Sequence, residues 1–425
     1  MNRRELLIAS GLFVLARNRA SAQAGVAPPA QQQSTPQQRL IDALRANRLP
    51  ITVTDGRPAG RGWDWLVERA RDARFTLIGE EHGVAETAQL STALFKALRP
   101  AGYTRMAVEL SPIIAQDIET AARRNGLQGI LNFSGRPDIF TPSSLHEEAQ
   151  LMASVVNAAP KGERVLWGID RELFNDRYLI SRLQPRVPAN ARTPFARLKE
   201  ASRNAYEQNR KNPGLPFLFS EDPALVTAVQ AAWPNPDRDS DTILRTLEES
   251  LAINAVARTG TAWDSAERRA QWMRNSFAAL LKADRSREPA PKVMMKAGYN
   301  HMIRGANYVD IFDVGSMPDE VAQLSGGHAF HIIVLPGPGS HQAALGPWPG
   351  FKSVSTDEFD EFRAGDQRLT RVLSNANATG PEVIDFRPLR SLAMRGLESW
   401  NTDVVKTIHG YDAAVIWKDA HASTS

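Results

Sequence analysis

The chain of 425 residues contains no cysteine. This absence excludes disulfide bonds, zinc sites built on thiolates, thiol nucleophiles, a lipidated N-terminal cysteine and thioether-linked haem. Beyond the N-terminal segment no stretch reaches about 18 uninterrupted apolar residues, so we expect no stable membrane insertion of the mature protein. A chain of this length can hold its fold by packing alone.

Charge of one sign is also scarce, because 51 basic residues nearly balance 47 acidic ones and the net charge is +4. No basic stripe interleaves with aromatic side chains, which make up 7% of the chain. We therefore expect no nucleic-acid partner. Most of the basic excess lies at the start of the chain, in Arg3, Arg4, Arg17 and Arg19.

The N-terminal residues 1–24 have the pattern of a cleavable export signal. A basic start with the Arg3-Arg4 pair precedes a short apolar stretch over 6–16, and small residues follow at 20–24. The arginine pair before two leucines is typical of a twin-arginine (Tat-like) signal. The alternative is a membrane anchor, but the apolar stretch is too short for an easy span. We predict a periplasmic or secreted protein, with residues 25–38 as a disordered Pro/Gln-rich linker.

The remaining residues, 39–425, alternate short apolar runs with helical patterns. Helical periodicity is strongest over 85–98, 112–124 and 144–159, and it dominates from about 171 to 287, which predicts a helical insertion. The alternation predicts an α/β domain with a mostly parallel central sheet and helices on both faces. The strand candidates are 75–79, 106–110, 165–169, 292–298, 329–335, 383–386 and 413–417.

Three of the predicted strands end on an acid or a histidine. The first runs into Glu80-Glu81-His82-Gly83, the second ends on Glu109, and the run from Lys292 leads to His301. A further predicted strand ends on Asp170, which is either a site residue or an exposed acid at a helix start. Because the carboxyl ends of parallel strands meet at one edge of a sheet, we expect these side chains to share a pocket.

Glu80 and His82 are the densest candidates for chemistry. They are two residues apart, so on an extended strand end they point the same way. A carboxylate beside an imidazole orients the ring and raises its basicity. The alternative is a polar loop between strand and helix, with the acids at helix N-termini. Imidazole and carboxylate groups are also a plausible ligand set for a divalent metal.

The other six histidines are expected to be structural or exposed. His146 lies on a predicted surface helix beside Glu147 and Glu148. His328 and His331 are three apart in a strand and therefore point to opposite faces. The remaining members of the group are His341, His409 and His421.

Over roughly residues 65–420 the chain resembles the erythromycin esterase-like family, which belongs to a wider group with the ChaN-type haem-uptake proteins and the Tiki metalloproteases. The strand ending in Glu80-Glu81-His82-Gly83 resembles the first motif of that family. The remaining motifs follow in the family's order: Met106-Ala107-Val108-Glu109, Trp167-Gly168-Ile169-Asp170, Arg269 with Met273, the strand leading to His301, and Tyr411-Asp412-Ala413-Ala414-Val415.

The resemblance implies a hydrolase acting on an ester or lactone bond of a small-molecule substrate. His82 would be the general base, with Glu80 and Glu109 orienting its ring or the water, and His301 would donate a proton or stabilise the oxyanion. Asp170 and Arg269 would position these groups. The chain departs from the family in two places. It has one residue between Glu80 and His82, where the esterases have two. Of the two histidines that the esterases often carry late in the chain, only His301 is present. These departures point away from macrolides as the substrate.

Two alternatives follow from the same resemblance. One is a metal-dependent, Tiki-like hydrolase or peptidase that uses the same residues as ligands. The other is a ChaN-like protein that binds haem through Tyr299 or His301 without catalysis. The leading hypothesis requires no cofactor.

Overall fold

The computed structural model describes residues 35–425 apart from 161, 212–215, 286–289, 346–349, 357–371, 376–377 and 396–401. The predicted export signal and residues 25–34 of the predicted linker lie outside the described residues. Helix α1 (Pro36–Ala46) occupies the last positions for which the sequence predicted linker, so ordered structure begins earlier than expected. Residues Pro36–Ser425 form one unit.

A sheet of 8 strands, in the order β1-β11-β12-β8-β4-β7-β5-β6, forms the centre of this described unit. All pairs from β12 to β6 are parallel, whereas β11 pairs in antiparallel fashion with both β1 and β12. The predicted α/β fold with a mostly parallel sheet is therefore confirmed. The strands are β1 (Arg48–Pro50), β4 (Phe75–Glu80), β5 (Tyr103–Val108), β6 (Leu166–Gly168), β7 (Lys292–Gly298), β8 (Ala329–Pro336), β11 (Glu382–Asp385) and β12 (Ala413–Trp417).

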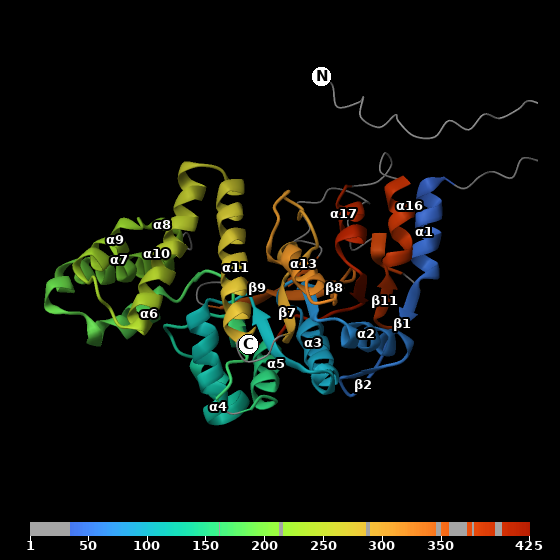
Figure 1. Cartoon of the computed structure of the whole chain (residues 1–425), viewed down its shortest axis with the longest axis horizontal. Helices are drawn as coiled ribbons and strands as arrows, with labels where there is room; N and C mark the ends of the chain where they lie inside the picture. The colour runs from blue at the N-terminus through green and yellow to red at the C-terminus, as the bar shows by residue number, and fades with distance from the viewer. Residues whose placement is uncertain are drawn as a thin grey trace, which may run out of the picture. The chain divides into compact units, whose positions relative to one another are not determined.

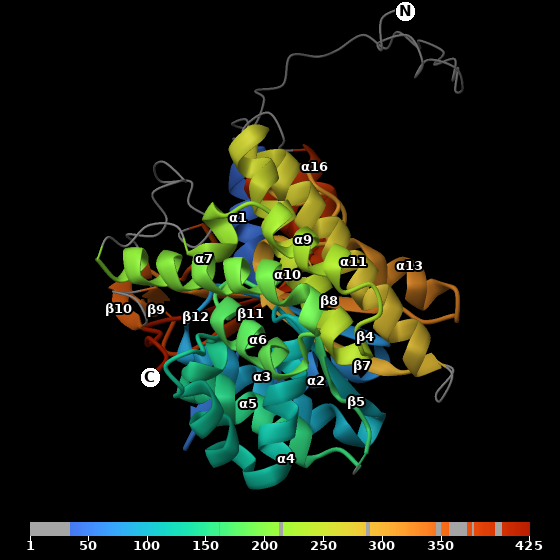
Figure 2. The ribbon, with the colours of Figure 1, turned by 90° about the vertical axis from the view of Figure 1, so that its left-hand side faces the viewer.

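Helices cover both faces of the sheet (Figures 1 and 2). Alternate side chains of each strand enter two separate cores: Met294 of β7 lies in one, and its neighbours Val293 and Met295 lie in the other. The first core includes side chains of α2 (Arg61–Asp72), α3 (Ala85–Leu98), α4 (Pro112–Ser134) and α5 (His146–Asn157). The second includes side chains of α1, α11 (Ala262–Arg285), α13 (Met317–Gln323), α16 (Arg390–Arg395) and α17 (Thr402–Gly410).

Between β6 and β7 the chain forms a group of helices that stands beside the sheet (Figure 1). These helices fall in the stretch for which the sequence predicted an insertion. The last of them, α11, returns to the sheet, where Phe277 meets Phe75 of β4 edge to face with ring centroids 5.9 Å apart. The others are α6 (Asp176–Leu183), α7 (Arg192–Lys211), α8 (Phe217–Ser220), α9 (Ala224–Ala232) and α10 (Arg238–Thr259).

Three smaller elements lie outside this framework. β2 (Thr52–Thr54) and β3 (Arg57–Ala59) form one small sheet, and β9 (His341–Leu345) and β10 (Phe351–Ser355) form another. The short helix α12 (Tyr299–Met302) directly follows β7. Within the residues that the structure describes, no helix is both long and apolar enough to cross a membrane.

Helix α4 shows where local sequence and tertiary structure disagree. The sequence predicted a helix that ends at Arg124, before Asn125 and Gly126. The backbone does leave helical geometry at these two residues, but helix resumes beyond them and continues to Ser134. The second half buries Ile130 completely in the first core, and this burial favours the continuation.

Gly83 fixes the turn from β4 into α3. Its φ is +74°, and an added Cβ would lie 2.1 Å from the carbonyl oxygen of Ala343 in β9. Its own carbonyl accepts hydrogen bonds from the backbone N–H groups of Ala343 and Ser423, both at 2.8 Å. Only glycine permits both the positive φ and this close approach.

We expect Gly83→Ala to reduce the free energy of unfolding by about 2–4 kcal/mol, because it adds a steric clash to backbone strain. Gly102→Ala is the matched control, since Gly102 has a φ of +94° but nothing within 4 Å of an added Cβ. This control should lose only about 1 kcal/mol. Urea unfolding of both variants measures the difference, and equal losses would contradict the clash.

Candidate active site

The carboxyl ends of four neighbouring strands bring the predicted site residues together. Glu80 is the last residue of β4, Glu109 follows β5, Asp170 lies two residues beyond β6, and His301 lies on α12 after β7. Arg269 reaches the same place from α11. All six residues named from the sequence are therefore joined in one chain of contacts, although their catalytic roles stay predictions.

His82 lies between two carboxylates. Its Nδ1 is 3.1 Å from Oε1 of Glu80, and its Nε2 is 3.5 Å from Oε2 of Glu109. The Glu80 side chain is only 7% exposed, whereas that of His82 is 59% exposed. The imidazole is thus held by a buried acid and remains accessible from the cavity described below.

Glu109 is the centre of the cluster. Its Oε1 accepts a hydrogen bond from Arg269 at 2.6 Å, and its Oε2 accepts one from the backbone N–H of Gly298 at 2.7 Å. Nε2 of His301 is 3.6 Å from Oε1. Burial alone would raise the pKa of Glu109, but the positive charges of His82, His301 and Arg269 and the Gly298 bond hold it well below its usual range.

The two imidazoles are arranged alike around Glu109. His301 presents Nε2 to Glu109 and places Nδ1 2.7 Å from Oδ2 of Asp313, as His82 places its own Nδ1 against Glu80. Asp313 in turn accepts a hydrogen bond from the backbone N–H of Val314 at 2.6 Å. Sequence reasoning missed Asp313 because it follows no strand.

The carboxylates keep a proton on His82. The part of the ring that is buried disfavours the positive charge, although much of the side chain is open to solvent. The charge of Glu109 and the hydrogen bond to Glu80 outweigh this effect and raise the pKa of His82 to about 9. In the resting protein at neutral pH the ring is therefore an imidazolium.

Arg269 connects Asp170 to this centre. Its Nε donates to Oδ1 of Asp170 at 3.0 Å, and one terminal nitrogen bonds both Oδ2 of Asp170 and Glu109. Asp170 is 1% exposed. Burial opposes the charge of the guanidinium, but the two carboxylates raise its pKa above the ordinary value. This geometry suits the positioning role predicted for the pair.

Lys296 and Glu148 also belong to the cluster, and the sequence did not indicate them. Nζ of Lys296 lies 2.6 Å from Oε2 of Glu80 and 2.7 Å from Oε1 of Glu148. The predicted helix with Glu147 and Glu148 is present as α5. The prediction that these two acids lie on the surface is wrong, because they are only 9% and 4% exposed. A lysine inside an otherwise apolar strand was the available signal, since a buried ammonium requires a partner.

A cavity of about 370 Å³ opens beside His82. Glu80, Glu109, Lys296 and Glu148 lie along its polar part, and most of its remaining wall is apolar. The apolar side chains include Val108, Leu110, Ile114, Leu145 and Met152.

A row of aromatic rings extends along this cavity and beyond it. Phe351 of β10 stacks on Phe140 at 4.9 Å, Phe140 meets Phe174 edge to face at 5.2 Å, and Phe174 stacks on Phe219 of α8 at 6.1 Å. The first three of these residues line the cavity. A site of this kind takes a ligand with an apolar body and few polar groups.

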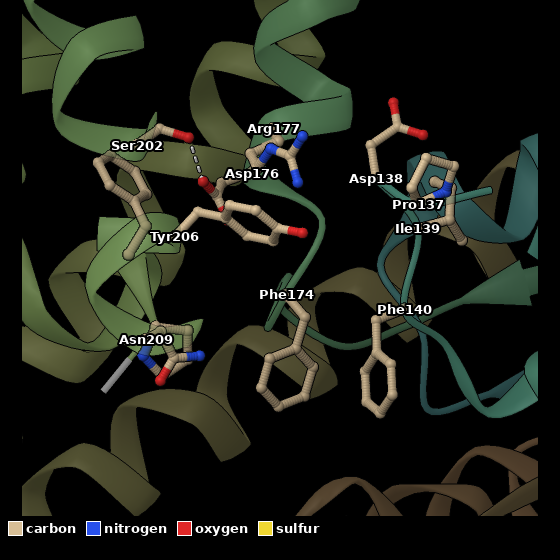
Figure 3. A pocket seen from close by; sticks show the side chains of 12 residues that line it. Pro137, Asp138, Ile139, Phe140, Phe174, Asp176, Arg177, Ser202, Tyr206 and Asn209 are labelled. Atoms are coloured by element: carbon tan, nitrogen blue, oxygen red, sulfur yellow. Dashed lines mark hydrogen bonds between the residues drawn. The ribbon is translucent and has the colours of Figure 1, made fainter. Parts of the chain in front are cut away.

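A second, smaller cavity of about 20 Å³ is also lined by Phe140 and Phe174 (Figure 3). Its size admits about one water molecule. Asp176 faces it and accepts a hydrogen bond from Ser202 of α7. Burial raises the pKa of Asp176 to about 7, because the Ser202 bond does not compensate for desolvation.

Acids of the cluster already have cationic partners in the protein. Among the described residues no group of three or more histidine and acidic side chains is placed to hold an ion. The carboxylates of Glu80 and Glu109 are already paired with Lys296 and Arg269, so an added cation would compete with protein charges.

The two predicted haem ligands contact other residues of the chain. His301 bonds Asp313, and the ring of Tyr299 meets that of Tyr308 edge to face at 5.4 Å. Neither residue lines the cavity beside His82.

Comparison with known proteins shows the fold. The sequence matches no protein-family profile and no curated protein. Its structure is similar to that of a Bacillus cereus protein, with a TM-score of 0.54, 14% identity and coverage of 91% of this chain and 98% of that one. A succinoglycan biosynthesis protein gives a TM-score of 0.57 at 12% identity, with 91% and 98% covered.

The erythromycin esterase EreC, in its open conformation, gives a TM-score of 0.53 at 14% identity, with 85% of this chain and 94% of that chain covered. The chain therefore has the α/β fold seen in an erythromycin esterase. This agrees with the resemblance found in the sequence motifs and establishes no activity.

We expect the imidazole of His82 to titrate near pH 9 in an NMR titration, and Glu109→Gln to lower that pKa because one of the two carboxylates is lost. The elevated pKa also stabilises the fold. This contribution is complete below about pH 6.5 and is lost as the pH rises through about 9. A His82 resonance titrating near pH 6.5 in both proteins would contradict the charge arrangement.

We expect Asp176→Asn to stabilise the protein at pH 8 by roughly 2–4 kcal/mol and to have much less effect at pH 4. A carboxyl whose pKa rises on folding costs stability that grows as the pH increases from about 4 to 7. Asparagine avoids this cost and still accepts the Ser202 bond. Urea unfolding of wild type and Asp176→Asn at the two pH values measures this change. A difference in the free energy of unfolding that is the same at both pH values would contradict the raised pKa of Asp176.

Proposed function

We propose that this protein is a hydrolase that cleaves an ester or lactone with His82 as the general base. The observation that carries the proposal is the arrangement of His82 between Glu80 and Glu109, with the ring open to a largely apolar cavity of about 370 Å³. The fold shared with an erythromycin esterase supports a hydrolase.

The reaction begins from neutral His82. Glu80 accepts the hydrogen bond from Nδ1–H, which leaves Nε2 as the basic atom facing Glu109. The separation of 3.5 Å between Nε2 and Glu109 is long for a direct hydrogen bond. We propose that a water molecule bonds to both groups, gives its proton to Nε2 and attacks the carbonyl carbon.

Collapse of the tetrahedral intermediate breaks the carbon–oxygen bond to the leaving group. The imidazolium of His82 gives the proton that it took from the water to the leaving alkoxide. His301, oriented by Asp313, faces Glu109 and helps to keep that carboxylate ionised. Glu109 stays ionised throughout, because its paired cations make it a weak base. Its role is to orient the water and stabilise both rings.

The proposal has two further parts, neither of which requires residues beyond the cluster. The reaction is metal-independent, since the carboxylates are neutralised by Arg269 and Lys296. The protein is exported, which rests on the sequence pattern of residues 1–24 alone. Macrolides are not proposed as the substrate.

The test is hydrolysis of a panel of para-nitrophenyl esters and lactones by wild type and His82→Gln. We expect the variant to lose about 10²- to 10⁴-fold in kcat/KM. Because His82 must be neutral to act, wild-type kcat/KM should rise with pH up to about 9, and chelators should not change it.

His421→Gln is the matched control. Nδ1 of His421 contacts a carboxylate, Oε1 of Glu86, at 2.6 Å, as His82 contacts Glu80, but the residue does not line the cavity. This variant should keep wild-type activity. Turnover by His82→Gln equal to that of wild type would remove the proposed base, and loss of activity on chelation would replace the metal-free mechanism.

A further inference from the structure

Arg171 lines the cavity beside His82 and has no acidic partner there. Its Nε is buried, and no atom of the described residues accepts a hydrogen bond from it. No ion pair within the described part of the chain includes its guanidinium, which lies over the ring of Phe219, 5.6 Å from the ring centroid. A partly buried guanidinium with an unpaired N–H group favours the binding of an anion.

The acids near Arg171 are engaged elsewhere. Asp170 and Glu109 both accept hydrogen bonds from Arg269, and Asp170 also accepts one from the backbone N–H of Arg171. Glu172 accepts bonds from three backbone N–H groups, from the side chain of Asn175 and from the hydroxyl of Ser111. Among these charged groups, the guanidinium of Arg171 is therefore the one with which a ligand can form a new ion pair.

The electrostatic balance agrees with this geometry. Burial and the positive charge of Arg269 lower the pKa of Arg171 to about 10, and the attraction of Asp170 and Glu109 does not compensate. Arginine still carries its charge at this value. Its surroundings favour an added negative charge.

Arg171 and His82 stand at different places along the cavity. His82 follows β4 and Arg171 follows β6, with β7 and β5 between these strands. Three strand spacings separate the strand ends by about 14 Å. Phe140, Phe174 and Phe351 line the same cavity and provide apolar surface for the body of a ligand.

We propose that Arg171 binds a carboxylate of the substrate, so that the substrate is an ester or lactone with an apolar body and a negative group remote from the bond that is cleaved. The planar guanidinium matches a carboxylate in a bidentate geometry. This inference rests on the proposed function, because it names the substrate class for the same cavity.

The experiment compares two esters of para-nitrophenol that differ only in charge. One is the half-ester of suberic acid with its free carboxylate, and the other carries the neutral carboxamide at that end. Wild type should prefer the charged ester by about tenfold to a hundredfold in kcat/KM, as expected for one charge-assisted contact. Arg171→Gln should reduce this ratio to about 1, and Arg171→Lys should keep part of it.

Arg177→Gln is the matched control. The Arg177 guanidinium stacks over the ring of Tyr206 at 3.8 Å and faces the smaller cavity, not the one beside His82. This variant should keep the wild-type ratio. Thermal unfolding of each variant verifies that the fold is intact.

Calorimetric titration with phenylhexanoate separates this inference from the proposed function, because it requires no turnover. Binding to wild type that Arg171→Gln weakens by tenfold or more supports the anion site even if neither ester is cleaved, which would overturn only the hydrolase. Hydrolysis of both esters with no charge preference overturns the anion site and leaves the hydrolase standing. Equal binding to wild type and Arg171→Gln also overturns the anion site.

Discussion

The site depends on keeping the buried carboxylate of Glu109 ionised. Without compensating positive charges and hydrogen-bond donors, a carboxylate in this position would be protonated, because burial disfavours its charge. Arg269, the Gly298 N–H and two imidazoles supply that compensation. Each comes from a different element, so the charge of one side chain fixes how β4, β7, α11 and α12 meet at the end of β5.

The surrounding charges alternate in sign and form one continuous chain. Asp170 pairs with Arg269, Arg269 with Glu109, Glu109 with His82, His82 with Glu80, and Glu80 with Lys296, which ends on Glu148. Buried ion pairs of this kind contribute little net stability, because desolvation offsets their attraction. Their effect is orientation: each side chain has one arrangement that satisfies both neighbours, and this holds the imidazoles ready for proton transfer.

The aromatic row comes from other segments than the central charged groups. Glu80, His82 and Glu109 lie at strand ends, whereas Phe174 and Phe219 belong to the stretch between β6 and β7, and Phe351 belongs to the β9–β10 pair. The sheet end thus sets the chemistry, while the insertion and the β9–β10 pair set which ligand fits beside it. Such a division lets peripheral segments change without disturbing the charges at the strand ends.

Much of the fold and the core of the site could be predicted from the sequence. A fully buried parallel strand must be a short apolar run, and its carboxyl end lies at the same edge as those of its neighbours. The runs before Glu80, Glu109 and His301 therefore indicated both the sheet and a shared site. Helix α3 was predicted over its full length from the four-residue spacing of its leucines.

The contributions of Asp313, Lys296 and Glu148 were decided only by the tertiary structure. Each has a partner distant in sequence or outside a strand end: Asp313 meets His301 across a loop, and Lys296 meets Glu148 from another element. The same is true of Arg171, whose lack of an acidic partner depends on where Arg269 lies. The sequence determined which residues stand at the strand ends, because strand periodicity is local. The pairing of their charges required the whole fold, because electrostatic compensation depends on distance in space and not along the chain.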